Sequence, residues 1–312
     1  MRVCLMIEGQ EGVTWPQWVA LARACEEHGI EALFRSDHYT GLAGRAAASN
    51  RSGGSLDAWA TICGLAAITE RLRLGTLVSP ATFRHPSVLA RTVVTADHIA
   101  GPNRIELGLG AGWHEPEHVQ HGFEFATAKE RVARFAEHLE IVHRSWTEEE
   151  LDFSGRFYEL RGARPLPKPL AKPNLIVGGS AKPGTANPAG RFADEYNTIF
   201  APPAEVGERR RRVEEACARA GRPMLTFSLM TQCVVGADRG EVDRRRRLLA
   251  ERTGREPEAR SGSTLVGTVD EVAERLHEYE AVGVERVMLQ HLLHEDLEMV
   301  ALIGRELAPA VA

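Results

Sequence analysis

Short apolar runs alternate along the chain with longer stretches in which apolar residues recur every three or four positions. The run 72–78 carries Leu and Val on both faces, which is typical of a strand buried on both sides of a parallel sheet. The longer stretches have the period of amphipathic helices. The expected strands span residues 3–7, 32–36, 72–78, 104–109, 175–177, 195–200, 225–235 and 285–290.

Signals for helix starts lie between these runs. A Ser or Thr followed three residues later by Glu or Gln forms a capping box, in which each side chain satisfies a free backbone N–H group of the first turn. This pattern predicts three helix N-termini along the chain. The pairs are Thr14 with Gln17, Thr127 with Glu130, and Thr268 with Glu271.

One segment, 148–173, interrupts the alternation with aromatic residues followed by four prolines. It predicts an extended insertion or small hairpin after the fourth helix, and not a domain linker, because the alternation resumes after it. Eight strands alternating with helices indicate α/β architecture, specifically one (β/α)8 TIM barrel domain over 1–312. A doubly wound sheet is a weaker alternative because neither half of the chain stands alone.

The charge, the cysteine pattern and the hydropathy of the chain argue against several classes of function. The net charge of -5 gives no electrostatic footprint for nucleic acid, and the arginine runs lie in Glu-rich helical patterns. The five cysteines are scattered without a CxxC pair, which argues against a disulfide framework or a zinc site. No basic and apolar leader precedes the first strand, and no window approaches the roughly 18 apolar residues of a membrane span. We therefore expect a cytoplasmic protein without membrane partners.

Chemistry-bearing residues follow the second and third expected strands. Asp37 and His38 come directly after an apolar run, and at the C-terminal rim of a barrel an acid beside an imidazole indicates catalysis. The local alternative is that Asp37 caps a turn and His38 is an ordinary loop histidine. The third strand ends at Val78 and Ser79 and continues into a polar stretch that contains Arg84.

Glycines follow the fourth strand, where Gly110 and Gly112 would let the backbone approach a ligand and place Trp113 and His114 beside it. This is a weak GxGxG pattern and not a dinucleotide-binding fingerprint, because Trp113 stands where a third glycine and a helix would follow.

The fifth strand ends in Gly178, Gly179 and Ser180 at the start of a helix. Free N–H groups at a helix N-terminus can cradle a phosphate, and the alternative is a flexible turn. The eighth strand ends at Gln290, which offers one more hydrogen-bonding group.

His114, His118 and His121 lie at helical spacing and raise the possibility of a metal site. Because spacing places no further oxygen or sulfur ligand beside them, we expect no metal. The neighbouring Glu115 and Glu117 suit a solvated loop and helix start equally well.

The joint pattern resembles the bacterial luciferase-like superfamily. The resemblance rests on four segments and covers nearly the whole chain. They are 35–38, 74–79, 108–118, and 178–180 together with 193–197. It implies a (β/α)8 barrel that binds FMN or the deazaflavin coenzyme F420, with closer similarity to the F420 branch.

The resemblance also implies roles for single residues. The backbone at Val78 and Ser79 would lie under the tricyclic ring, in a bulge with a non-proline cis peptide. Asp37 would contact the ring region and His38 would be the acid or base. Where relatives carry a glutamate in the fourth-strand loop, this chain has Trp113 and His114, and His114 is the substitute proton donor. The cofactor-binding candidates are Asp37, Val78, Ser79, Gly110, Gly112, Gly178, Gly179 and Ser180.

Three functions are open at this point. The first is an F420-dependent oxidoreductase that transfers a hydride between the reduced deazaflavin and a small organic substrate. The second is an FMN-dependent monooxygenase that uses O2 and reduced flavin from a separate reductase. The third is a non-catalytic flavin-binding protein. Trp113, Arg84 and Gln290 are the candidate substrate contacts, and the resemblance implies a homodimer.

Overall fold

The computed structural model describes residues 1–41, 54–254 and 263–312. Within these ranges eight parallel strands close a barrel, because β8 and β9 pair and join the two edges of the sheet. The order around the barrel is β1-β2-β3-β4-β7-β8-β9-β11, so neighbouring strands follow one another in sequence. The barrel strands are β1 (Arg2–Ile7), β2 (Ala32–Arg35), β3 (Arg73–Pro80), β4 (Ile105–Gly110), β7 (Asn174–Gly178), β8 (Glu195–Ile199), β9 (Thr226–Gly236) and β11 (Arg286–Gln290).

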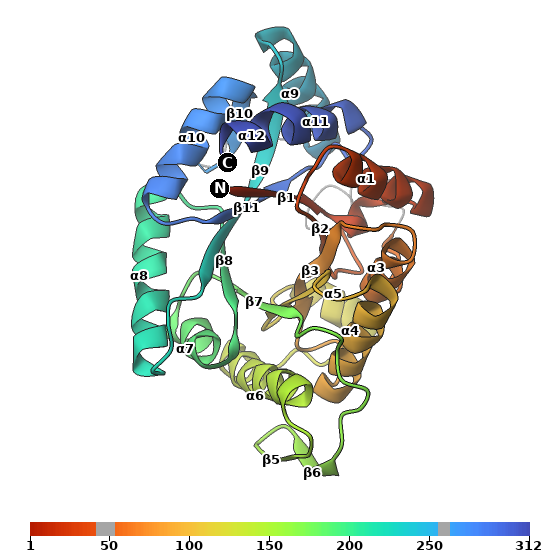
Figure 1. Cartoon of the computed structure of the whole chain (residues 1–312), viewed down its shortest axis with the longest axis vertical. Helices are drawn as coiled ribbons and strands as arrows, with labels where there is room; N and C mark the ends of the chain where they lie inside the picture. The colour runs from red at the N-terminus through yellow and green to blue at the C-terminus, as the bar shows by residue number, and fades with distance from the viewer. Residues whose placement is uncertain (42–53, 255–262) are drawn as a thin grey trace.

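Helices surround the barrel, and the two chain ends lie near one another beside β1 (Figure 1). The expected (β/α)8 barrel is confirmed. The α-helices are α1 (Trp15–Glu27), α3 (Ala58–Ala66), α4 (Pro86–Ala100), α5 (Glu115–His121), α6 (Ala128–Thr147), α7 (Pro183–Phe192), α8 (Pro203–Arg219), α9 (Arg239–Thr253), α10 (Val269–Ala281), α11 (Leu297–Leu302) and α12 (Ala308–Ala310). A 3-10 turn (Gly9–Glu11) follows β1, and a π-helical turn (Ile303–Leu307) separates α11 from α12.

The predicted helix starts agree with the structure. Both reciprocal bonds of the capping box are present at Thr14 and at Thr268, and the Thr127 hydroxyl accepts from the Glu130 N–H group. After α6, residues 148–173 contain a two-stranded antiparallel hairpin, which projects away from the barrel in Figure 1. Its strands are β5 (Leu151–Ser154) and β6 (Glu159–Ala163).

Strand β9 is longer than its neighbours and belongs to two pairings. Ser228 to Gln232 pair with β11, whereas Cys233 to Gly236 pair with an additional parallel strand, β10 (Leu265–Thr268). The sequence pattern did not predict β10.

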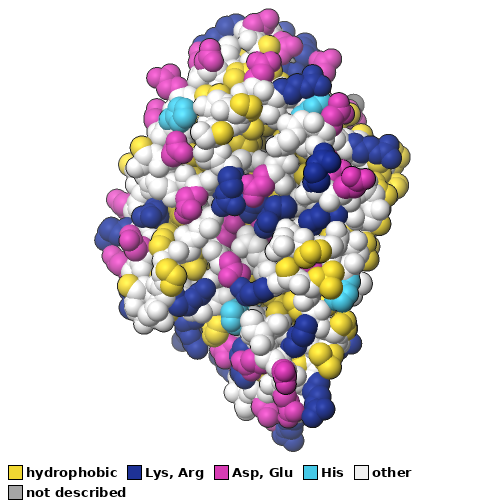
Figure 2. Space-filling view, viewed as in Figure 1, with side chains coloured by type: hydrophobic (Ala, Val, Ile, Leu, Met, Phe, Trp, Pro, Cys, Tyr) yellow, Lys and Arg dark blue, Asp and Glu magenta, His cyan; other side chains and the backbone are white. Residues whose placement is uncertain are grey.

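The apolar core has two parts. The larger part lies between the strands and the helices, and the smaller part fills the barrel interior with side chains such as Met6, Phe34 and Met288. On the face shown in Figure 2, acidic and basic side chains are interspersed. None of the helices in the described ranges is long and apolar enough to cross a bilayer.

A cluster of buried, charged side chains closes the N-terminal end of the barrel interior. Arg286, at the start of β11, is 1% exposed and donates to both carboxylate oxygens of Glu106 at 2.7 Å and to Glu195 at 3.0 Å. Burial alone would raise the pKa of Glu106, but Arg286 holds it well below its usual value. The cluster ties β4, β8 and β11 together beneath the core.

Candidate active site

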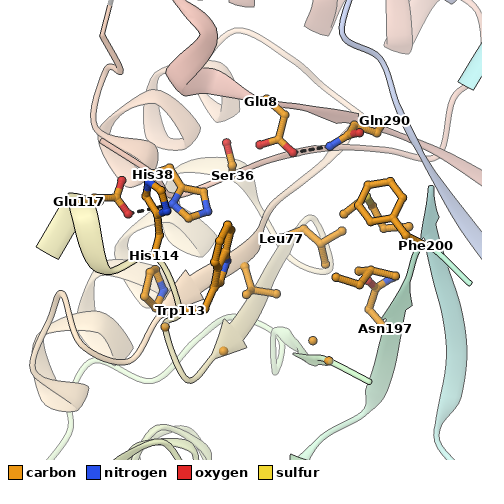
Figure 3. A pocket seen from close by; sticks show the side chains of 18 of the residues that line it. Glu8, Ser36, His38, Leu77, Trp113, His114, Glu117, Asn197, Phe200 and Gln290 are labelled. Atoms are coloured by element: carbon orange, nitrogen blue, oxygen red, sulfur yellow. Dashed lines mark hydrogen bonds and ion pairs between the residues drawn. The ribbon is translucent and has the colours of Figure 1, made fainter. Parts of the chain in front are cut away.

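A cavity of about 850 Å³ opens at the opposite, C-terminal end of the barrel. This is the end at which barrel enzymes place their catalytic groups. Figure 3 shows side chains from several strand ends converging on the cavity. Every barrel strand or the segment after it contributes, through Glu8, Ser36, His38, Leu77, Val78, Gly110, Gly178, Asn197, Met230, Gln232 and Gln290.

His38 and Glu117 form a buried pair at one wall of this cavity (Figure 3). The Nδ1 atom of His38 lies 2.9 Å from a carboxylate oxygen of Glu117, whose side chain is fully buried at the start of α5. The other Glu117 oxygen accepts from the backbone N–H groups of Tyr39 and Thr40. Because Nδ1 is engaged, Nε2 is the ring nitrogen left to act in the cavity.

The protonation of this pair follows from its contacts. Burial alone would lower the pKa of His38, but the hydrogen bond and negative charge of Glu117 raise it above its usual value. Burial would likewise raise the pKa of Glu117, yet His38 and the two backbone donors hold it low. The pair is therefore stable as an imidazolium beside a carboxylate. The sequence pattern left Glu117 as a solvated helix start, because its contact with His38 exists only in the folded barrel.

Asp37 is not among the described residues that line the cavity. Its carboxylate accepts from both terminal nitrogens of Arg84 and from the Ser79 hydroxyl at 2.7 Å. Arg84 also pairs with Asp57 at 2.8 Å. Ser79 and Arg84 are likewise not among the described residues that line the cavity, so these three residues form a network beside it, and their contacts with a ligand stay a prediction.

This network holds the end of β3 in an unusual shape. The Leu77–Val78 peptide is cis and the pairing of β3 with β4 shifts between Thr76 and Ser79, as the resemblance implied. The Ser79 hydroxyl also accepts from the Trp59 indole at 3.1 Å, which fixes the far side of the bulge. Leu77 and Val78 form part of the cavity floor.

Glycines on β4 and β7 make room for Val78. A Cβ atom at Gly110 would lie 2.7 Å from Val78 Cγ2, and one at Gly178 would lie 2.9 Å from Val78 Cγ1. Contacts this short do not occur between real side chains without displacement. Gly112 has a φ of 77°, which favours glycine for a conformational reason. These glycines shape the bulge as well as the cavity.

The turn between β7 and α7 presents backbone to the cavity. Gly178, Gly179 and Thr185 line it, whereas Ser180 is not among the described lining residues. The Tyr196 hydroxyl lies beneath the turn, 2.8 Å from the Ala181 nitrogen and from the Thr185 hydroxyl. The α7 N-terminus has no side-chain cap, so its N–H groups suit an anionic group such as a phosphate.

Asn197 supplies a polar atom that the protein leaves unsatisfied. Its side chain is 1% exposed and donates to the Ser228 hydroxyl at 2.9 Å, but its Oδ1 atom has no partner in the described structure. Asn197 lines the cavity beside Phe200 and Leu77 (Figure 3). A buried carbonyl oxygen without a donor costs free energy, so it points to a ligand N–H or O–H group.

Gln290 and Glu8 line the cavity at the ends of the neighbouring strands β11 and β1 (Figure 3). The Gln290 amide donates to one Glu8 oxygen at 2.5 Å, and the Gln10 amide donates to the other at 2.8 Å. Gln290 thus lines the cavity, as expected, and also orients a carboxylate. Sequence analysis did not identify Glu8, which immediately follows β1.

Trp113 and His114 border the cavity next to His38. Their rings meet the His38 ring edge-on at centroid distances of 5.9 and 6.1 Å. Trp113 is 62% exposed, and burial lowers the pKa of His114. His118 is already engaged by the Thr82 hydroxyl and the His114 carbonyl, and the described residues contain no cluster of three potential metal ligands.

Comparison with known proteins identifies the family to which this barrel belongs. The family model described as luciferase-like monooxygenase matches residues 5–286. The chain belongs to this luciferase-like family. A relative named F420-dependent glucose-6-phosphate dehydrogenase, from Nakamurella multipartita, is 28% identical over alignments covering 93% of this chain and 90% of the relative.

Other similar proteins have names that indicate different reactions. Pyrimidine monooxygenase RutA of Stutzerimonas stutzeri is 31% identical, over 58% of this chain and 49% of that protein. Among solved structures, an F420-dependent secondary alcohol dehydrogenase in complex with an F420-acetone adduct superimposes over the full length of both chains, with a TM-score of 0.83 and 19% identity. At that identity the likeness shows the fold alone. At the level of the family, the protein is an oxidoreductase.

Proposed function

We propose that this protein is an F420-dependent oxidoreductase that transfers a hydride between the deazaflavin and a small organic substrate. The observation that carries the proposal is the buried pair of His38 and Glu117 on the wall of a cavity that a tricyclic cofactor would fill. Similarity to an F420-dependent dehydrogenase over nearly the whole chain supports the choice of cofactor.

The residues present fit such a cofactor. Volumes of about 300–1,000 Å³ are usual for cofactor and ligand sites, and this cavity is near the upper end. Leu77 and Val78 would support the ring, the unsatisfied Asn197 oxygen would accept a ring N–H, and the turn at Gly178 and Gly179 would hold the phosphate. The chemistry that bound F420 supplies is hydride transfer to or from a carbon atom.

The charge state of His38 favours the reducing direction. A hydride delivered to a C=C, C=N or C=O bond leaves a negative atom that needs a proton. An imidazole whose pKa is raised keeps that proton to higher pH than an ordinary histidine does, and Glu117 holds the ring so that Nε2 can deliver it. Trp113 would help exclude water from this side of the cavity.

The second candidate is an FMN-dependent monooxygenase that is fed by a partner reductase. The similarity to a pyrimidine monooxygenase favours it. In that case the same cavity would hold FMN, and His38 would donate or accept the proton of an oxygen-insertion reaction.

Titration of the purified protein with F420 and FMN separates the two candidates. We expect F420 to bind with the lower Kd and turnover with reduced F420 to proceed without O2. Binding of FMN alone, with turnover that requires O2, would replace the first candidate by the second. A protein that binds neither cofactor would contradict both.

A further inference from the structure

The cavity has a second charged region, remote from the turn at Gly178 and Gly179. Arg252, near the C-terminal end of α9, lines the cavity together with Gln232 and Gln290. Gln232 and Gln290 are direct partners across the β9–β11 pairing, so two amide side chains stand side by side at this rim. Of the described residues that line the cavity, Arg252 is the single arginine or lysine.

The guanidinium of Arg252 is held by uncharged hydrogen-bond partners, while the carboxylates of Glu11 and Glu295 act on it only through space. One terminal nitrogen lies 3.0 Å from the nearer ring nitrogen of His294 and 3.4 Å from the Glu11 carbonyl oxygen. Burial, together with the charge of Arg252, lowers the pKa of His294 to about 4, so this histidine is a neutral partner at neutral pH. Within the described ranges no carboxylate oxygen lies within 4 Å of this guanidinium, and the residue is exposed at the cavity mouth.

Another arginine of α9 forms ion pairs within the protein. Arg245, two turns earlier, bonds to the carboxylates of Glu241 and Asp296 and is buried. An arginine that completes a protein ion pair stabilises the fold, whereas one whose remaining N–H groups face a cavity is suited to bind a carboxylate or phosphate, often through two parallel hydrogen bonds.

We propose that Arg252 is the recognition site for an anionic group, a carboxylate or phosphate, on the substrate. The inference rests on the proposed function, which assigns the turn before α7 to the cofactor. In the barrel order, β8 separates β7 from β9, so the two anion positions lie on different walls. A substrate that spans the cavity would place its acid at Arg252 and the Gln232 amide, and its reacting carbon toward His38.

Binding to the cofactor-free protein tests this directly. Benzoate and phenyl phosphate are the anionic probes, and benzamide is the neutral probe of similar shape. The exposed Trp113 in the cavity wall provides a fluorescence signal, and calorimetry gives the Kd. We expect one of the two anions to bind about tenfold more tightly than benzamide in the wild type, with the preference falling as salt rises.

Two variants decide the assignment. Arg252→Gln should abolish the preference for the anion, and Arg247→Gln, at an exposed position of α9 that does not line the cavity, should retain it. An unchanged preference in Arg252→Gln, or no preference in the wild type, overturns the proposal.

The Kd for F420 and FMN, measured on the same two variants, identifies the source of the anion. We expect Arg252→Gln to leave cofactor affinity within about twofold of wild type. A loss of cofactor affinity that matches the loss of anion binding would assign Arg252 to the cofactor and overturn the substrate role. If the wild type bound neither cofactor, the proposed function would fail, while the probe measurements would still report whether Arg252 selects anions.

Discussion

The two ends of the barrel use buried polar groups in opposite ways. At the N-terminal end, Arg286 lies 2.7 Å from Glu106 and 3.0 Å from Glu195, so these three charges satisfy one another inside the protein, although one Glu195 oxygen has no partner among the described residues. At the C-terminal end, Asn197 Oδ1 has no partner in the described structure and the His38 pair borders an open cavity of about 850 Å³.

This comparison distinguishes buried charged groups that stabilise the fold from buried charged groups that can act on a ligand. Both ends bury ionisable groups, and burial by itself shifts pKa values at both. What distinguishes the functional end is that its groups are oriented by the protein on one side and left available on the other. Glu117 holds Nδ1 of His38 and leaves Nε2, whereas every side-chain nitrogen of Arg286 donates to a buried group, Nε to the Cys4 sulfur and the other two to the carboxylates.

The largest effect is expected from breaking the N-terminal cluster. Replacing Arg286 by Met leaves Glu195 buried without its cation and Glu106 with Arg73 alone, which should lower the free energy of unfolding by about 3–5 kcal/mol. Urea denaturation at pH 7 measures it. Arg2→Met, which removes an exposed partner of Glu31, is the control and should cost less than about 1 kcal/mol. Equal losses in the two variants would contradict a structural role for the cluster.

At the functional end, His38→Ala should act on turnover. Loss of a positioned proton donor typically costs about 100-fold or more in kcat, while the cofactor Kd should change little. Steady-state kinetics and a cofactor titration of the same sample separate the two quantities. His121→Ala, on the exposed side of α5, is the matched control. Unchanged turnover in His38→Ala would remove this residue from the reaction and revive a carrier role for the barrel.

A smaller effect is expected where the glycines accommodate the β3 bulge. Gly178→Ala places a methyl group against Val78 and should weaken cofactor binding about tenfold, in line with the cost of overpacking. Adding Val78→Ala should restore part of the affinity, because the crowded atom is removed. A double-mutant cycle on the cofactor Kd checks the coupling, and additive losses would show that the contact does not shape the cofactor site.

The smallest effect concerns pH. The reducing reaction needs protonated His38, so kcat/KM should fall as the pH rises through its raised pKa. Glu117→Gln keeps an acceptor for the Tyr39 and Thr40 N–H groups but removes the charge, which lowers the pKa of His38. The fall should then come about one pH unit lower. A profile that stays in place, or moves to higher pH, would contradict the assigned partner.

More of the fold than of the candidate site could be predicted from the sequence. Alternating apolar runs and the capping boxes at Thr14 and Thr268 predict the barrel and its helix starts, because these signals are local. The roles of Glu117 and Asn197 depend on contacts between segments tens of residues apart. The residue types alone therefore do not predict these roles. For Asp37 the sequence did not reveal the hydrogen bonds with Ser79 and Arg84, which also join segments far apart in the chain.

The double membership of β9 has a consequence for how this protein can diversify. The pairings that close the barrel end at Gln232, and the residues from Cys233 onward pair with β10 instead. The helix α9, with Arg252 near its end, therefore connects the end of β9 to β10, a strand outside the closed barrel. If Arg252 recognises the substrate as proposed, exchange of that unit between relatives would change the group that a substrate must present, without altering the strands that close the barrel.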